Sequence, residues 1–474
     1  MLSSGRLKLF NPETISKMRR ASLVDYVTAG VGLALWRLFF PGLMSQDSVI
    51  QYGQAITGHY NDWQPPLLAL AIRVVLGLGG ALGLLMLGQC LAGVFGVRAL
   101  ARACIEFFHG ERLPAGRVAW LSLLALLLLL VPLSPLAFYL MTLWKDAWAA
   151  ILLLWIGALA LDLFRRGASR RRIALLVACA TLLGLVRHNA VVLLPLLGLA
   201  LWIGVRRSGV ARPAALAVAA APLALYLAAN PLLDAVLRVE KLHPDSQIMS
   251  IDLVGLCAAG RAVCDRLPWT KAHIRDESGL ARYRPGDIGF IFWDHPSPVD
   301  PAIRLDYPRL RAEYLRAAWE FPGLLATVKL RAFATLLGLD RTFYFFHSTI
   351  VGNPYGLALN GRFAPLRQRL VEVTQRVAEH PVLRWVSGVH LVWIVVNLLW
   401  VIGLLPFPRY RFLACVLLIP LGYFLSYLLA TPMHDFRFMY PSTLMVQCVT
   451  VSWALGGLAQ KPAGRAPNLA RFSA

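Results

Sequence analysis

An isolated carboxylate follows the first apolar segment of the chain. Asp47 lies in the stretch GLMSQDSVIQYG at residues 42–53, and the polar side chains Ser48, Gln51 and Gln54 come after it at helical spacing. A carboxylate in such a position can accept a proton from an incoming hydroxyl or amine, which is the task of a general base. The alternative is structural, because Asp is also favoured as the cap of a helix that begins at Ser48.

Three further clusters of ionisable residues lie at the ends of apolar segments. An ionised side chain at the centre of a bilayer costs about 2.5–3.5 kcal/mol, so we expect these residues to line a water-filled cavity rather than to face lipid. The alternative is that each is a boundary residue whose charged end reaches the membrane surface. The clusters are Lys145–Asp146, Arg187–His188 and His434–Asp435–Arg437.

The residue types in these clusters suit group transfer from a phosphate-linked donor. Arginine and lysine can hold and neutralise a leaving phosphate, and arginine does so with two parallel hydrogen bonds. Nucleotide sugars and ATP stay in the cytoplasm, so an energy-rich donor used across the membrane must be carried there on a lipid. Such a donor would bring its phosphate to the depth at which these cations are expected.

The composition indicates a polytopic membrane protein. Of its 474 residues, 58% are hydrophobic and only 15% are charged, whereas about a quarter of the residues of a soluble protein are charged. The mean hydropathy is +0.61. The net charge of +22 is better explained by lysine and arginine in cytoplasmic loops than by nucleic-acid binding.

The apolar segments predict an all-α bundle of about ten transmembrane helices. Basic clusters, among them residues 165–172 and 206–212, then fall on one side, which makes both termini cytoplasmic. The first segment has a basic flank and no cleavage site, so we expect it to be retained as a signal-anchor. The expected spans are 24–43, 80–101, 118–138, 147–164, 173–187, 190–205, 213–230, 386–405, 411–430 and 437–458.

This map divides the chain into three parts. Residues 1–230 form an N-terminal membrane module with the first periplasmic loop, and residues 386–474 form a C-terminal membrane module. Between them, residues 231–385 contain 16 of the 25 acidic residues and are expected to form a periplasmic domain with membrane-surface helices. Its segment 310–338 has helical periodicity and is expected on the membrane surface or as an additional pair of spans.

Two of the seven cysteines, Cys257 and Cys264, lie in this expected periplasmic domain. An oxidising compartment would allow a disulfide between them. A regular helix over the same residues would instead hold them too far apart to bond. The sequence leaves both alternatives open. It contains neither a CxxC pair nor an HExxH motif of a metal site.

The order and sidedness of these motifs resemble the C-type superfamily of membrane glycosyltransferases (GT-C). The chain looks most like a bacterial branch with uncharacterised relatives of the protein mannosyltransferases and aminoarabinose transferases. The pattern extends over most of the chain, and Gln64 stands where relatives often have His. Its elements are SQDSVIQYGQAITGHY, DWQPPL, the KD turn, LVRHNAVVLLP and the closing HDFRFMYP.

The resemblance implies an inner-membrane enzyme whose active site faces the periplasm. It would transfer a sugar from a polyprenyl-phosphate donor to an envelope glycan, lipid or protein, with Asp47 as the general base. Lys145, Arg187 and Arg437 would bind the lipid phosphate. Some members of the superfamily need a divalent metal and others do not, and Asp47 with Asp62 or Asp146 could hold one. The sugar or acceptor would be bound by Asp62, Asp146, His188, His434, Asp435 and Tyr440.

Two rival functions remain at the level of sequence. An O-antigen ligase or polymerase also uses a large, late periplasmic loop, but the early Asp47 favours the sugar-phosphate enzyme. A transporter of lipid-linked glycans would also need cations for phosphate. Transporters usually contain internal repeats and polar groups near the midplane, whereas here the polar groups gather on one face.

Overall fold

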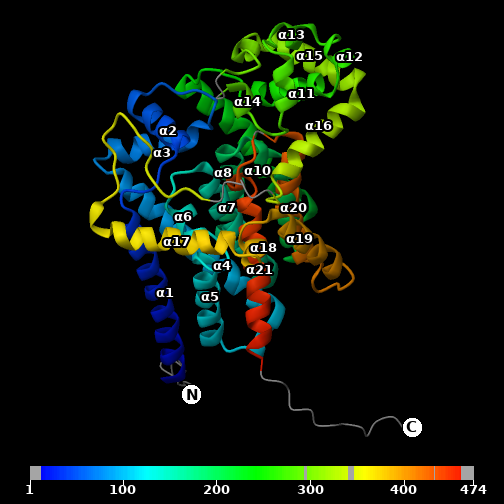
Figure 1. Ribbon diagram of the computed structural model, residues 1–474. Coiled ribbons are helices and arrows are strands. Elements are labelled where there is room, and N and C mark those ends of the chain that lie inside the picture. Colours follow the sequence, from blue (N-terminus) through cyan, green and yellow to red (C-terminus); the bar gives the residue numbers. More distant parts are fainter. Residues whose placement is uncertain (1–11, 293–295, 340–345, 432, 461–474) are drawn as a thin grey trace, which may run out of the picture.

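The computed structural model describes residues 12–292, 296–339, 346–431 and 433–460, and over these residues the protein is helical without a β-strand. Figure 1 shows a bundle of long helices with a small helical domain at one end. The described start of α1 (Pro12–Phe39) and the end of α21 (Tyr440–Leu458) both lie at the opposite end of the bundle. The predicted all-α class is therefore confirmed.

The bundle is built around α4 (Leu82–His109) and α7 (Lys145–Arg166), which pack against each other and both pack against α21. Leucine and alanine dominate these helices, and their side chains form one continuous buried core. Small residues let backbones approach closely: a Cβ atom on Gly198 of α9 would lie 2.6 Å from the carbonyl oxygen of Ala219 in α10. The long helices are α1 (Pro12–Phe39), α4 (Leu82–His109), α5 (Ala115–Leu130), α7 (Lys145–Arg166), α8 (Arg170–Val186), α9 (Leu194–Arg207), α10 (Arg212–Leu237), α19 (His390–Leu404), α20 (Arg411–Leu429) and α21 (Tyr440–Leu458).

Five helical segments in the described part of the chain are long and apolar enough to cross a membrane. This agrees with a membrane protein, while the expected number of about ten spans stays a prediction. One expected span, 118–138, is not a continuous helix. Its helix α5 ends at Leu130 and a short helix α6 begins at Leu136, because Pro132 and Pro135 interrupt the backbone hydrogen bonds. The five segments are Leu82–His109, Lys145–Arg166, His188–Arg207, Arg212–Leu237 and Arg411–Leu429.

The first loop, expected over residues 44–79, folds into two helices. Helix α2 (Gln46–Thr57) carries Asp47, and helix α3 (Pro66–Gly77) is apolar. Proline is well suited to the first turn of a helix, which explains where α3 begins. The sequence-based map missed α3 because 12 residues are too few for a transmembrane span.

The small domain at the top of Figure 1 covers residues 245–335 and has its own hydrophobic core. The expected helix 310–338 is divided in two, since Pro322 begins a new helix after Phe321. Residues 346–371 instead contribute apolar side chains to the core of the bundle. The helices of the small domain are α11 (Asp245–Ala259), α12 (Arg261–Cys264), α13 (Pro268–Ala272), α14 (Gly289–Phe292), α15 (Tyr307–Glu320) and α16 (Pro322–Thr335), with 3-10 turns at Ser278–Arg282 and Pro301–Arg304.

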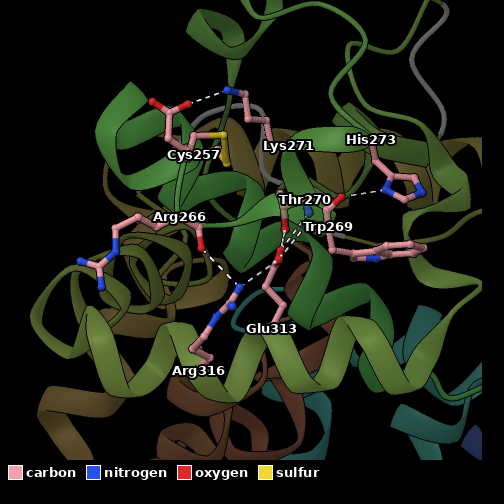
Figure 2. Close-up of a disulfide and its surroundings, with 10 residues drawn as sticks. Cys257, Arg266, Trp269, Thr270, Lys271, His273, Glu313 and Arg316 are labelled. Carbon is pink, nitrogen blue, oxygen red and sulfur yellow. Dashed lines mark hydrogen bonds and ion pairs between the residues drawn. A yellow bond between two sulfur atoms is a disulfide. The ribbon is translucent and has the colours of Figure 1, made fainter.

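A disulfide joins Cys257 to Cys264 in the small domain (Figure 2). This decides between the two alternatives that the sequence left open. Helix α11 ends at Ala259 and Gly260 leaves the helical conformation, so the chain folds back and the two Cα atoms lie 4.3 Å apart. The buried carboxylate of Glu313 supports the same corner by accepting hydrogen bonds of 2.8 Å from the backbone N–H groups of Trp269 and Thr270 (Figure 2).

Helix α17 (Ala364–Glu379) follows the small domain and packs beside α1. Figure 1 shows it lying across the long axis of the bundle rather than along it. Its Arg367 donates a hydrogen bond of 3.0 Å to the carbonyl oxygen of Leu38 at the end of α1. The segment after the small domain is thus attached to the first helix of the chain.

Candidate active site

Asp47 does not cap helix α2, contrary to the structural alternative. The helix begins at Gln46 and its N-cap is Ser45, whose backbone N–H donates a hydrogen bond of 3.2 Å to the Ser48 hydroxyl. Asp47 is therefore in the first turn, where the partial positive charge of a helix N-terminus stabilises a carboxylate. Its side chain is free to point into the cavity described below.

Two hydrogen bonds hold the segment around Asp47 against the residues just before Lys145. The backbone N–H of Leu143 donates a hydrogen bond of 2.9 Å to the carbonyl oxygen of Leu43. The Ser48 hydroxyl donates one of 2.8 Å to the carbonyl oxygen of Leu143. The polar face of α2 that follows Asp47 is thus turned inwards. Its contact with Leu143 holds Asp47, the candidate base, close to the start of α7.

Arg437 lies between two carboxylates. Its guanidinium forms ion pairs of 2.6 Å with Asp47 and 2.8 Å with Asp435. The same guanidinium lies over the ring of Trp144, 5.2 Å from its centroid. Asp435 also accepts a hydrogen bond of 3.0 Å from the backbone N–H of Arg437, which caps the 3-10 turn Phe436–Phe438. The HDFR motif therefore presents one cation at a fixed place beside Asp47.

Arg187 is held in place by buried side chains of the bundle. It forms an ion pair of 3.0 Å with Asp146, which is fully buried. Two hydroxyl groups of α20 also contact it, those of Tyr427 and, at 3.4 Å, Tyr423. These partners engage Nε and Nη2 of the guanidinium, whereas Nη1 has no partner among the described residues, and Arg187 lines the cavity described below.

Lys145 has no carboxylate within ion-pair distance among the residues that the structure describes. Its ammonium group donates a hydrogen bond to the side-chain oxygen of Gln64. Gln64 thereby orients the lysine. An ammonium group without a counter-ion at the wall of a cavity suits an anionic ligand.

Two neighbouring cavities meet at Asp47 and Arg437. We name them by their walls. The domain-side chamber, of about 820 Å³, is enclosed partly by residues 301–307 of the small domain. The bundle-side chamber, of about 610 Å³, is lined by Lys145, Arg187 and the end of α20. Asp47 and Arg437 line both chambers, so a group in either one can reach them.

Eight of the ten predicted site residues line these chambers. Asp47 and Arg437 line both, Lys145, Arg187, Asp62 and His188 line the bundle-side chamber, and His434 and Asp435 line the domain-side chamber.

Two predicted residues lie elsewhere. Asp146 is covered by Arg187 and lines neither chamber. Tyr440 is fully buried, and its hydroxyl lies 2.8 Å from the Ser134 hydroxyl, against the ring of Tyr139. The sequence placed both near the site because it shows the order of residues along a helix but not the direction of each side chain. Neither residue can contact a sugar in this arrangement.

Sequence reasoning missed the part of the site that comes from residues 241–247 and 301–307. Residues 60–62 of the first loop pair with Glu240, and the Asp62 carboxylate accepts a hydrogen bond of 2.6 Å from the backbone N–H of Leu242. This pairing brings Lys241, His243 and Gln247 to the cavity. A contact between segments so distant in the chain has no local signal in the sequence.

The electrostatic environment differs between the two carboxylates of Arg437. Burial by itself would raise the pKa of Asp47, but the charges of Arg437 and Lys145 hold it below its usual value of 3.8. Burial raises the pKa of Asp435, although Arg437 opposes this effect. The pKa of Asp47 is therefore lowered and that of Asp435 raised, although both carboxylates contact the same guanidinium.

The candidate metal site is not assembled. Asp62 is engaged by Leu242 and Asp146 by Arg187, so neither joins Asp47 as a ligand. Within the described part of the chain, no group of three or more His, Cys, Asp or Glu side chains is placed to hold a metal ion. The described residues therefore assemble no three-ligand site around Asp47.

Comparison of the chain with models of protein families, with curated proteins and with solved structures finds no match.

Proposed function

We propose that the protein is an integral membrane glycosyltransferase that resembles the GT-C superfamily. It transfers a sugar from a polyprenyl-phosphate donor to an envelope glycan, lipid or protein, at the periplasmic side of the bacterial inner membrane. The observation that carries this proposal is the meeting of two chambers at one ionised carboxylate, Asp47, with cations on one side of it.

The bundle-side chamber suits the phosphate of the donor. Lys145 supplies an ammonium group without a carboxylate partner within ion-pair distance in the described residues, and Arg187 supplies Nη1 of its guanidinium. Charge-assisted hydrogen bonds from such groups are the strong ones. They would stabilise the negative charge that develops on a leaving phosphate.

The reaction would be a single displacement that inverts the anomeric carbon. The acceptor hydroxyl gives its proton to the Asp47 carboxylate while its oxygen bonds to the anomeric carbon. The bond between that carbon and the phosphate oxygen breaks, and the electron pair leaves with polyprenyl phosphate. Because Arg437 is paired with Asp47 at 2.6 Å, an arriving phosphate can compete for Arg437 and thereby release the base as the donor binds.

Mass spectrometry of envelope glycans and glycolipids would test this function. A strain that lacks the gene would be complemented with the wild type, with Asp47→Asn, or with Asp265→Asn as a matched control. Asp265 is exposed in the small domain and paired only with Lys271 within the described residues. We expect one sugar to disappear on deletion and to return with the wild type and the control but not with Asp47→Asn.

Other outcomes would favour the rival functions. Accumulation of whole lipid-linked glycans would favour a ligase, polymerase or transporter. Full restoration by Asp47→Asn, at normal expression, would show that Asp47 is not the base.

A further inference from the structure

The domain-side chamber contains one cation that nothing in the described residues neutralises. The acidic residues that line this chamber, Asp47 and Asp435, are both paired with Arg437. Lys241 is paired with Asp234 at 2.6 Å. Arg304 also lines the chamber, but its guanidinium has neither a carboxylate nor a hydrogen-bond acceptor within reach among the residues described.

Arg304 is nevertheless held in a defined position. Its guanidinium lies over two aromatic rings, 5.2 Å from the centroid of Trp63 and 5.0 Å from that of Phe292. Trp63 comes from the first loop and Phe292 from the small domain, so the two parts of the chain fix the cation between them. Cation–π contacts of this kind use the face of the guanidinium. They leave its N–H groups, which lie in the plane, free to bind an anion.

The rest of the chamber offers surfaces for a sugar. Trp63, Trp144 and Tyr307 line it with aromatic side chains, which are largely apolar and carry a polar group at one edge. The ring of His243 stacks on Tyr307 at 3.8 Å between centroids. Aromatic side chains with a few polar groups provide both contact area and orientation for a carbohydrate.

We propose that the domain-side chamber binds the acceptor and that the acceptor is a glycan with an anionic group, which Arg304 recognises. This inference rests on the proposed function, because it assigns the substrate class of the same site. The guanidinium fork matches both carboxylate and phosphate, so the anionic group is a uronic-acid carboxylate or a phosphate ester. Arg304 lines only the domain-side chamber, whereas Lys145 and Arg187 line only the bundle-side chamber, so acceptor recognition is separate from donor recognition.

Binding to the full-length protein in lipid nanodiscs would test this proposal without any donor. The probes are one disaccharide in three forms: with a carboxylate, with a phosphate monoester, and neutral. We expect calorimetric titration to give a Kd at least about tenfold lower for an acidic form than for the neutral one. The form that binds more tightly identifies the carboxylate or the phosphate as the recognised group.

Variants of Arg304 show whether this residue recognises the anionic group or only holds Trp63 and Phe292 together. Arg304→Gln should bind all three probes about equally, whereas Arg304→Lys should keep part of the preference. Arg309→Gln is the matched control, because Arg309 lies over Trp269 at 5.5 Å and away from the chamber, and it should keep the full preference. Equal binding of all probes by the wild type, or an unchanged preference in Arg304→Gln, would overturn the proposal.

Failure of this inference is distinguishable from failure of the proposed function. The envelope analysis with Asp47→Asn tests transfer, while the titration tests recognition alone. A transferase whose wild type binds the three probes equally would keep the function and lose the acidic acceptor.

Discussion

At the scale of residues, the main feature of the site is that two of its carboxylates share one cation. Arg437 serves both Asp47 and Asp435, whereas Lys145 has no carboxylate partner within ion-pair distance in the described residues. Each carboxylate is thus neutralised only in part. An anionic donor would place its negative charge beside Lys145, the cation that no carboxylate of the described residues pairs with.

Replacing Arg437 by Gln should reduce the rate of sugar transfer by about 100-fold or more. The variant lacks the guanidinium that would both orient Asp47 and stabilise the leaving phosphate. Arg437→Lys should recover only a small part, since an ammonium group cannot bridge Asp47 and Asp435 with the same fork. The measurement is the initial rate of sugar transfer in membranes that contain equal amounts of each variant. A variant Arg437→Gln with wild-type rate would remove Arg437 from the site.

The pH dependence follows from the lowered pKa of Asp47. A carboxyl whose folded pKa lies below 3.8 is ionised throughout the neutral range, so we expect kcat/KM to show no acid limb from Asp47 above about pH 5. The ion pair with Arg437 adds stability above the unfolded pKa, and this contribution is lost as the pH falls through the folded pKa. An acid limb with a midpoint above about pH 5 would contradict Asp47 as an ion-paired base.

At the scale of elements, one lysine joins the small domain to the bundle. Lys329 of α16 forms an ion pair of 2.7 Å with Asp252 of α11 and donates a hydrogen bond of 2.8 Å to the carbonyl oxygen of Leu429, the last residue of α20. The Tyr314 hydroxyl donates a further hydrogen bond of 3.2 Å to Asp252. Helix α20 leads directly to the HDFR motif, so this contact sets the small domain relative to Arg437.

Removing the lysine should destabilise this junction. In Lys329→Met the Asp252 carboxylate, which is 3% exposed, loses its cation, and breaking a buried pair in this way costs about 3 kcal/mol. Thermal unfolding of the full-length protein in detergent would measure the loss. The double variant Lys329→Met/Asp252→Leu should recover most of the stability, because no unpaired charge remains. An equal loss in the double variant would show that packing, rather than charge, holds the junction.

The sequence predicts the elements better than their details. Length and hydropathy are local properties, so the helices of the bundle follow from leucine-rich and alanine-rich segments. The direction of a side chain is not local: Asp146 and Tyr440 lie at predicted helix ends yet point into the core. Lys241 reaches the chambers because the first loop pairs with the neighbouring Glu240. Arg304 reaches its chamber because the small domain lies against the first loop. Such contacts depend on tertiary structure, which no single segment encodes.

At the scale of the whole molecule, charge is distributed by side. Basic loops such as residues 165–172 and 206–212 lie at one end of the membrane helices, while the acidic residues gather in the segment 231–385. Lysine and arginine in short loops favour the cytoplasmic side. The chambers between the small domain and the bundle therefore belong to the opposite side in the topology that we propose.

Two equivalent substitutions would test this topology. Ser208 and Ser278 are both exposed serines, one in a basic loop and the other in the small domain. In intact cells, a membrane-impermeant maleimide should label Ser278→Cys but not Ser208→Cys, and both should react after the membrane is opened. Because the disulfide protects Cys257 and Cys264, a variant that lacks the free cysteines gives a clean background. Labelling of Ser208→Cys in intact cells would reverse the orientation.

The ion pair between Asp47 and Arg437 also has a consequence for biosynthesis. Asp47 is translated and inserted early, whereas Arg437 emerges only just before the last helix, α21. A partly synthesised chain thus carries the carboxylate without its cation and without the chamber wall that residues 433–437 supply. The reactive geometry can form only when insertion is nearly finished, so unfinished chains cannot consume the lipid-linked precursor that the finished protein would use.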